Sequence, residues 1–148
     1  MTQQVYVLNG PNLNLLGQRE PEIYGATSLD DIQADMRARA GSLQLTFRQT
    51  NSEGTLVDWV QEASEQSDVL IINAGAYTHT SVALHDALRA CKATIIEVHV
   101  SNPAARESFR QVNYVAPVAL GSVAGFGARG YAMALDYALE IMDKKEND

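Results

Sequence analysis

The most constraining feature of the sequence is the uninterrupted apolar run Val69-Leu70-Ile71-Ile72, which ends in Asn73. A short run of branched apolar residues, bounded by polar ones, is typical of a strand that is buried on both faces. Such strands occur in parallel sheets that helices cover on both sides. The run therefore predicts that the chain folds around the central strand of a parallel sheet.

Segments with strand character alternate with segments of helical periodicity along the rest of the chain. The predicted strands lie at 5–8, 43–47, 68–73, 94–98 and 117–123, and the strand at 43–47 has the polar alternation of a sheet edge. The predicted helices lie at 28–41, 55–63, 82–89, 104–111 and 131–142, and a long loop at 11–27 follows the first strand. This alternation predicts parallel strands joined by right-handed helical crossovers.

The expected fold class is α/β, a flavodoxin-like doubly wound sheet of five parallel strands flanked by helices. The strand order 2-1-3-4-5 follows by analogy with that fold, since the sequence alone does not fix the order. The 148 residues suit a single domain, 1–148, and the charged segment 143–148 is expected to fray.

Charge and cysteine usage exclude several classes of protein. A net charge of −7 disfavours nucleic acid and anionic membranes as partners, so an anionic ligand would need a local basic pocket. Cys91 is the only cysteine, which rules out an intramolecular disulfide and suits a reducing compartment. The sequence has no signal-peptide pattern and no apolar run of ~20 residues, so we expect a cytoplasmic protein without a membrane partner.

Polar side chains gather where three of the predicted strands end. In a doubly wound sheet, ligands bind beyond the carboxyl ends of the strands, near the point where the strand order reverses. The residues that follow these ends carry amides, imidazoles, a carboxylate and a hydroxyl, and they are Asn9, Asn12, Asn14, Asn73, His79, Glu97, His99, Ser101 and Asn102. We therefore predict a small-molecule site at this edge of the sheet.

Each of these residues also has a purely structural interpretation. Asn9 and Asn73 could cap turns, because asparagine tolerates a left-handed backbone. Glu97 lies in an apolar strand and could pair with an arginine or a backbone group. His79 could cap the start of a helix, and His99 could be a hydrogen-bonded core histidine.

Two kinds of catalysis are disfavoured by the spacing of their residues. A metal site is not expected, because His79 and His85 are six residues apart and no cysteine pair accompanies them. An imine mechanism needs a lysine in the pocket. Lys92 precedes the fourth predicted strand, at the opposite edge of the sheet, and Lys144 and Lys145 lie in the tail.

Motifs along nearly the whole chain, about residues 5–140, resemble those of one enzyme family. The matching blocks are Asn9-Gly10-Pro11-Asn12-Leu13-Asn14-Leu15-Leu16-Gly17, Arg19-Glu20-Pro21, Tyr24-Gly25, Asn73-Ala74-Gly75, Thr78-His79-Thr80-Ser81, Asp86-Ala87, Glu97-Val98-His99-Val100-Ser101-Asn102 and Arg106 through Arg110. In this combination and order the chain resembles the type II 3-dehydroquinate dehydratases.

The resemblance implies a hydro-lyase that converts 3-dehydroquinate to 3-dehydroshikimate by anti elimination of water through an enolate, with no cofactor and no metal. Tyr24 would be the general base at the carbon beside the ketone, and Arg19, on the same mobile loop, would favour its phenolate form. Asn12 would stabilise the enolate through an ordered water. His99, oriented by Glu97, would be the acid that protonates the departing hydroxyl.

The resemblance also implies how the substrate is bound and how the chain assembles. The residues implied in substrate binding are Asn73, His79, Asp86, Val100, Ser101 and Arg110. Val100 and Ser101 would present backbone donors to the carboxylate, and Asp86 would reach the site of a neighbouring subunit. Members of the family form dodecamers of four trimers, so a homo-oligomer is expected.

The sequence departs from the resemblance at three places, Pro103–Ala105, Gln111–Asn113 and His85. None of these departures is expected to touch the proposed base or acid. Other function classes fit less well. A flavin or nucleotide carrier would need a loop of amide donors where Pro11 stands, and a phosphoacceptor domain would need clustered aspartates after the first strand. A catalytically silent homologue is disfavoured by the presence of Arg19, Tyr24 and His99.

Overall fold

The strands of the structure are β1 (Gln4–Asn9), β2 (Gln44–Gln49), β3 (Val69–Asn73), β4 (Thr94–His99) and β5 (Gly121–Ala124). They form one sheet in the order β2-β1-β3-β4-β5, and all neighbouring pairs are parallel. This confirms the predicted doubly wound, flavodoxin-like order. The structure is a computed structural model and describes residues 4–147.

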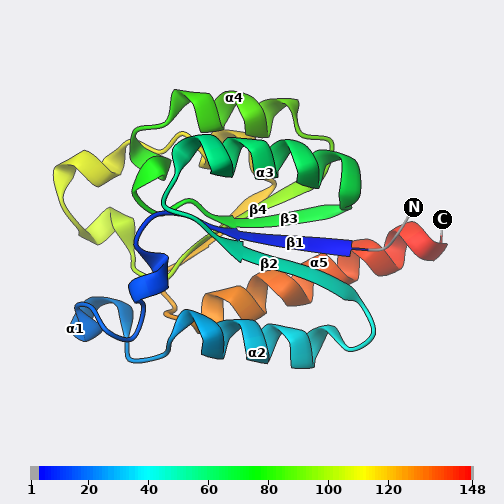
Figure 1. The fold of residues 1–148 in the computed structure, drawn as a ribbon, viewed down its shortest axis with the longest axis horizontal. Helices are drawn as coiled ribbons and strands as arrows, with labels where there is room; N and C mark the ends of the chain where they lie inside the picture. The colour runs from blue at the N-terminus through cyan, green and yellow to red at the C-terminus, as the bar shows by residue number, and fades with distance from the viewer. Residues whose placement is uncertain (1–3, 148) are drawn as a thin grey trace.

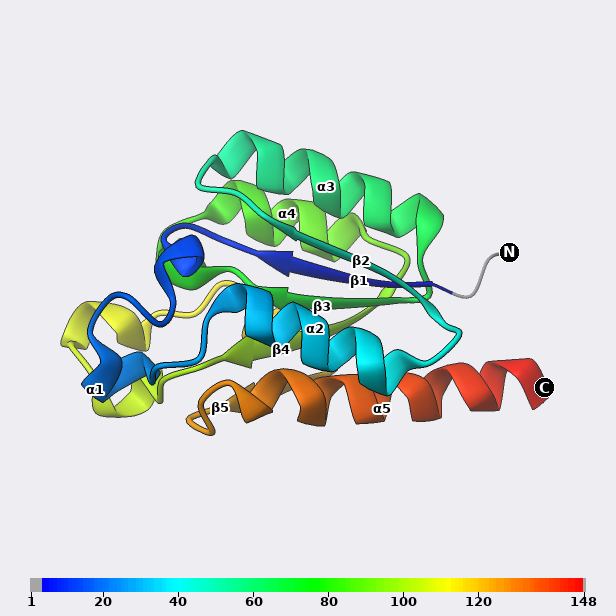
Figure 2. The same cartoon turned by 60° about the horizontal axis from the view of Figure 1, so that its bottom comes forward.

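Two pairs of helices cover the two faces of the sheet. Their bounds are α2 (Leu29–Ala40), α3 (Glu53–Gln66), α4 (Val82–Ala90) and α5 (Arg129–Asn147). Figures 1 and 2 show α3 and α4 together on one face and α2 and α5 on the other. All residues of β1 and β3 are buried, as the apolar run predicts, whereas β2 lies at the edge and is partly exposed.

The period-2 alternation of the strands divides the core into two layers. One set of strand residues packs on α2 and α5, and it consists of Val5, Val7, Leu45, Val69, Ile71, Ile96 and Val98. The other set packs on α3 and α4, and it consists of Tyr6, Leu8, Leu70, Ile72 and Ile95. Both faces of the central strands are therefore filled, and functional groups are confined to the strand ends.

Serine residues cap the N-termini of three helices, α2, α3 and α4. Ser28 and Asp31 form a capping box at α2, in which each side chain binds the backbone N–H of the other residue. Ser52 caps α3, and Ser81 caps α4 at Leu84 N. These caps satisfy backbone donors that the first helical turn leaves free.

The loop predicted at 11–27 contains two short helical turns, η1 (Leu13–Leu15) and α1 (Pro21–Tyr24). Pro21 begins α1, where its missing N–H costs no helical hydrogen bond. No residue of α1 is buried. Both views show α1 beyond the carboxyl ends of the strands, beside the segment around residues 103–112.

The predicted helix at 104–111 is wrong. The structure has two 3-10 turns there, η3 (Pro103–Ala105) and η4 (Ser108–Gln111), with extended backbone at Arg106 between them. A regular helix needs an apolar face to bury, and the only large apolar side chain of the segment, Phe109, is exposed.

Two further boundaries differ from the prediction. The strand predicted at 117–123 begins only at Gly121, because Pro117 instead supports the 3-10 turn η5 (Ala116–Val118). In the segment 143–148, predicted to fray, residues 143–147 continue α5 as a helix, and residue 148 lies outside the described residues. Lys144 and Lys145 contact Glu140 and Asp68 and also suit the negative end of the helix dipole. No helix within residues 4–147 has both the length and the apolarity to cross a membrane.

Candidate active site

A cavity of about 110 Å³ opens beyond the carboxyl ends of β1, β3 and β4, at the predicted edge. It is lined by Pro11, Asn12, Leu13, Leu15, Leu16, Arg19, Tyr24, Asn73, Gly75, Ala76, His79, His99, Val100, Ser101, Pro103, Arg106 and Arg110. Pockets for drug-sized ligands enclose roughly 300–1,000 Å³, so this one suits a small, compact ligand. Three arginines line it, so it is a local basic pocket of the kind that an anionic ligand would need in a chain of net charge −7.

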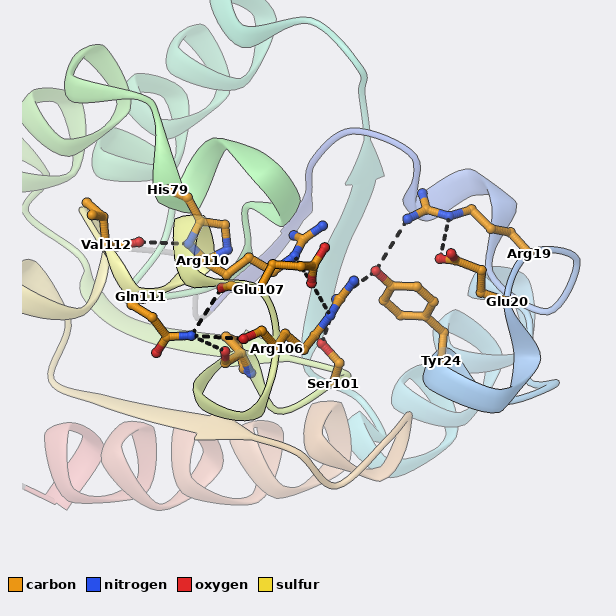
Figure 3. A network of polar contacts seen from close by, with 11 residues as sticks. Arg19, Glu20, Tyr24, His79, Ser101, Arg106, Glu107, Arg110, Gln111 and Val112 are labelled. Atoms are coloured by element: carbon orange, nitrogen blue, oxygen red, sulfur yellow. Dashed lines mark hydrogen bonds and ion pairs between the residues drawn. The ribbon is translucent and has the colours of Figure 1, made fainter.

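Tyr24 lines the cavity and lies between two arginines (Figure 3). Arg19 Nη2 donates to the Tyr24 hydroxyl at 3.3 Å, and Arg106 Nη1 donates to the same oxygen at 2.8 Å. Arg106 Nη1 also donates to Ser101 Oγ at 3.0 Å. Arg106 was part of a recognised block but had no predicted role, and nothing in the sequence links it to a tyrosine 82 residues away.

His99 and Glu97 form a buried pair at the end of β4. His99 Nε2 lies 2.7 Å from Glu97 Oε2, and Glu97 is 1% exposed. Asn113 Nδ2 and Ser122 Oγ also donate to the carboxylate, at 2.9 and 2.6 Å. Burial favours the neutral acid, but the hydrogen bonds from His99, Ser122 and Asn113 outweigh it and hold the pKa of Glu97 below its ordinary value.

Asn113 and Ser122 are site residues that the sequence analysis missed. Asn113 lies in one of the three departures, which were expected to stay clear of the base and acid. It does not contact the proposed acid itself, but it contacts that residue's partner, Glu97. Glu97 does not line the cavity; it supports His99 from behind.

A network below the cavity joins the ends of β1 and β3 to α5. The Tyr131 hydroxyl donates to Asn9 Oδ1 at 2.7 Å and accepts from Asn73 Nδ2 at 2.9 Å. Asn73 Oδ1 accepts from the Gly75 amide at 3.2 Å. Burial raises the pKa of Tyr131, so this hydroxyl stays neutral and fixes both amides. The described hydrogen bonds of the Asn73 side chain thus go to Tyr131 and Gly75.

His79 and Arg110, which lie in the segments after β3 and β4, also line the cavity. His79 Nδ1 lies 2.7 Å from the Val112 carbonyl, which can only accept, so Nδ1 carries the hydrogen and Nε2 is left as an acceptor. Burial lowers the pKa of His79, against the opposing effect of that carbonyl, and favours this neutral form. The His79 and His99 rings stack with centroids 6.3 Å apart. Arg110 Nε donates to Glu107 at 3.0 Å.

The backbone brings Asn12 to the cavity in a left-handed conformation, with φ of 69°. Its N–H donates to Asn51 Oδ1 at 3.0 Å. Such a conformation is uncommon for a residue other than glycine, and it occurs often at ligand sites. Asn12 therefore presents its amide side chain from a constrained turn.

Among the polar residues predicted at the strand ends, Asn14 and Asn102 are exposed and do not line the cavity. Of the residues that were given a catalytic or binding role, only Asp86 lies apart from this cluster. It is exposed on α4 and does not line the cavity. Among residues 4–147, no group of three or more His, Cys, Asp or Glu side chains is placed to hold a metal ion. What the site does bring together is a phenol, an imidazole–carboxylate pair and three guanidinium groups, a set suited to proton transfer on an anionic ligand.

Comparison with known proteins shows the family of the chain. The family described as "Dehydroquinase class II" matches residues 3–139. A 3-dehydroquinate dehydratase of Hyphomonas neptunium is 64% identical, over 95% of this chain and 96% of the relative. A 3-dehydroquinate dehydratase of Brucella canis is 53% identical, over 100% of this chain and 96% of the relative. The crystal structure of a type II dehydroquinase from Butyrivibrio crossotus has a TM-score of 0.89 at 40% identity, over 93% of this chain and 97% of the other. The chain therefore belongs to the class II dehydroquinase family of lyases.

Proposed function

We propose that this chain catalyses the dehydration of 3-dehydroquinate to 3-dehydroshikimate, with Tyr24 as the general base and His99 as the general acid. The observation that carries the proposal is that both side chains line one small cavity, each held by a charged partner. Arg19 and Arg106 donate to the Tyr24 oxygen, and Glu97 binds His99. Relatives named 3-dehydroquinate dehydratase support the choice of substrate.

In the first step, the Tyr24 phenolate removes a proton from the carbon beside the substrate ketone. The electron pair of the broken C–H bond passes to the ketone oxygen and gives an enolate. Guanidinium donors bind an anionic oxygen more strongly than a neutral one, which favours the phenolate that this step needs. Asn12, acting through an ordered water, would stabilise the enolate oxygen from its turn at the cavity.

In the second step, the enolate re-forms the ketone and a carbon–carbon double bond, and the neighbouring C–O bond breaks. The departing hydroxyl takes a proton from His99 and leaves as water, on the face opposite to the proton that was removed. The protein is then left with a protonated Tyr24 and a neutral His99. One proton must therefore pass from Tyr24 to His99, through solvent, before the next turnover.

The remaining polar groups of the cavity would hold the substrate. The backbone N–H groups of Val100 and Ser101 would bind its carboxylate, and Asn73 would orient that end of the ring. His79, whose Nε2 is an acceptor, suits a ring hydroxyl as donor. Arg110 would bind a second hydroxyl and balance the negative charge of the ligand.

The proposal also includes assembly: the chain forms a homo-oligomer, and the expected form is a dodecamer built from four trimers. Asp86 is exposed and would contact the substrate of a neighbouring subunit. Val82, Phe109 and Val112 expose apolar side chains on the elements around His79, which supports an interface there. Light scattering on the purified protein should give a multiple of the 16.1 kDa chain; a monomer with full activity would contradict the role of Asp86.

The test of the reaction is the appearance of the conjugated enone absorbance when 3-dehydroquinate is added. We expect turnover in the presence of a chelator and of borohydride, loss of turnover in Tyr24→Phe and His99→Gln, and normal turnover in Tyr137→Phe. Tyr137 is exposed on α5 and does not line the cavity, so it controls for the loss of a phenol hydroxyl. A folded wild-type protein that binds the substrate without producing the enone would contradict the proposal, and an active Tyr24→Phe would exclude Tyr24 as base.

A further inference from the structure

Glu97 accepts hydrogen bonds at both of its carboxylate oxygens. His99 Nε2 and Asn113 Nδ2 both reach Oε2, at 2.7 and 2.9 Å, and Ser122 Oγ reaches Oε1 at 2.6 Å. Within residues 4–147, no lysine or arginine forms an ion pair with Glu97. The ionisable groups around it are His99 and, farther away, His79.

The orientation of the Asn113 amide is fixed by the turn that contains it. Its Oδ1 accepts from the N–H groups of Val115 and Ala116, both at 2.8 Å. Because that oxygen faces two backbone donors, the NH₂ group must be the one that faces Glu97. Asn113 therefore donates to Glu97, as Ser122 does, and hydrogen bonds donated to a carboxyl group stabilise its ionised form.

This arrangement determines the position of the proton on His99. Because an ionised carboxylate can only accept, the hydrogen in the bond between Glu97 Oε2 and His99 belongs to Nε2 of the ring. Nδ1 is then the ring nitrogen that gives up and regains a proton. Loss of the hydrogen bond from Asn113 would weaken the preference of Glu97 for its ionised form. A proton held on Oε2 would donate to Nε2, which would move the ring hydrogen of neutral His99 to Nδ1.

We propose that Asn113 and Ser122 are positioning residues for the dehydration, because their hydrogen bonds to Glu97 keep the His99 proton on Nε2 and leave Nδ1 to act as the acid. This inference rests on the proposed function. A purely structural interpretation of Asn113 is that it only caps the turn at Val115 and Ala116. The two interpretations differ in which atom matters, Nδ2 for positioning and Oδ1 for capping.

Asn113→Asp separates the two roles, since it keeps an oxygen for the turn and replaces the donor to Glu97 with an acceptor. Two carboxyl groups this close cannot both stay ionised, so a proton is retained near Oε2. We expect kcat to fall roughly 10- to 100-fold with KM within about twofold, and the low-pH limb of the kcat profile to move to higher pH. Wild-type kcat and pH profile in this variant would overturn the role of Asn113.

Ser122 offers a second test that leaves the turn intact, because its side chain has one described hydrogen bond, to Glu97. Ser122→Ala should raise the pKa of Glu97 and move the low-pH limb in the same direction, by less than Asn113→Asp. Ser122→Thr keeps the hydroxyl and should restore the wild-type profile. Identical profiles in Ser122→Ala and wild type would remove Ser122 from the proposal.

Nitrogen-15 NMR of the three histidine side chains measures the tautomer without any turnover. Neutral His99 should carry its hydrogen on Nε2 in the wild type and lose that preference in Asn113→Asp. If the wild type shows no dehydratase activity but the tautomer responds in this way, the proposed function fails and the positioning role stands. If the enzyme is active and the tautomer does not respond, the positioning role fails alone.

Discussion

Arg106 and Tyr24 are 82 residues apart in the chain, and a hydrogen bond of 2.8 Å joins their side chains. The same Arg106 nitrogen donates to Ser101, so the loop that carries Tyr24 is tied to the end of β4. Arg19, the partner expected from the sequence, makes a longer contact of 3.3 Å and is more exposed, at 37% of its side chain against 15% for Arg106. In this conformation Arg106 is therefore the stronger partner of the two.

Arg106→Gln should lower kcat more than Arg19→Gln does. A hydrogen bond from a charged donor to a partly buried oxygen contributes more than one at an exposed site, so we expect a loss of roughly 10- to 100-fold for Arg106→Gln. Arg106→Lys keeps the charge, but an ammonium group cannot reach the hydroxyl oxygens of Tyr24 and Ser101 in the same geometry, so its kcat should lie between those of the wild type and Arg106→Gln. Steady-state kinetics of the three variants decide the order; a larger loss in Arg19→Gln would show that Arg19 moves closer when substrate binds.

Tyr131→Phe should destabilise the protein and disturb the site from below. The change leaves Asn9 Oδ1 and one hydrogen of Asn73 Nδ2 without their partner in a buried position, which costs about 1–3 kcal/mol in the free energy of unfolding. Asn73 lines the cavity, so KM should rise as its amide is freed. Urea unfolding measures the first effect, and Tyr137→Phe, an exposed tyrosine on the same helix, should change stability by less than ~0.5 kcal/mol.

The central strands and the location of the site could be predicted from the sequence because both depend on short segments. The run ending at Asn73 must be buried on both faces, and the polar residues after β1, β3 and β4 must share one edge of a parallel sheet. The contacts of Arg106, Asn113 and Tyr131 could not be predicted, because they join segments far apart in the chain. Tyr131 in particular reads as one more apolar position of an amphipathic helix, and only the packing of α5 shows where its hydroxyl points.

The stability of the protein should fall in acid partly through Glu97. Its pKa in the folded protein lies below the ordinary value of 4.5, so the unfolded chain binds the proton more readily. The stabilisation is therefore fully present above about pH 5 and is lost as the pH falls through the folded-state pKa. Glu97→Gln removes this contribution, and urea unfolding between about pH 3 and pH 6 should show a shallower pH dependence than in the wild type. If the free energy of unfolding depended on pH equally in the two proteins, other carboxylates would account for the loss of stability in acid.

Gly10 and Gly25 flank the loop that carries Asn12, Arg19 and Tyr24, and alanine at each should have a different effect. A Cβ at Gly10 would overlap the backbone of Ala74, where β1 and β3 meet. Since neither backbone can move without opening the sheet, Gly10→Ala should cost about 1–3 kcal/mol or more in the free energy of unfolding.

Gly25 has open space around its Cβ position, but its φ of 81° and ψ of 176° lie in a region open almost only to glycine. Gly25→Ala should relieve the strain by shifting α1, which buries no residue, so stability should change little. Tyr24 immediately precedes Gly25 and would shift with α1 away from Arg106, so kcat should fall. Thermal unfolding and steady-state kinetics on both variants distinguish the two effects. A stable, active Gly10→Ala would show that the sheet end can adjust, and an unchanged kcat in Gly25→Ala would show that Tyr24 is held by its arginines rather than by the turn.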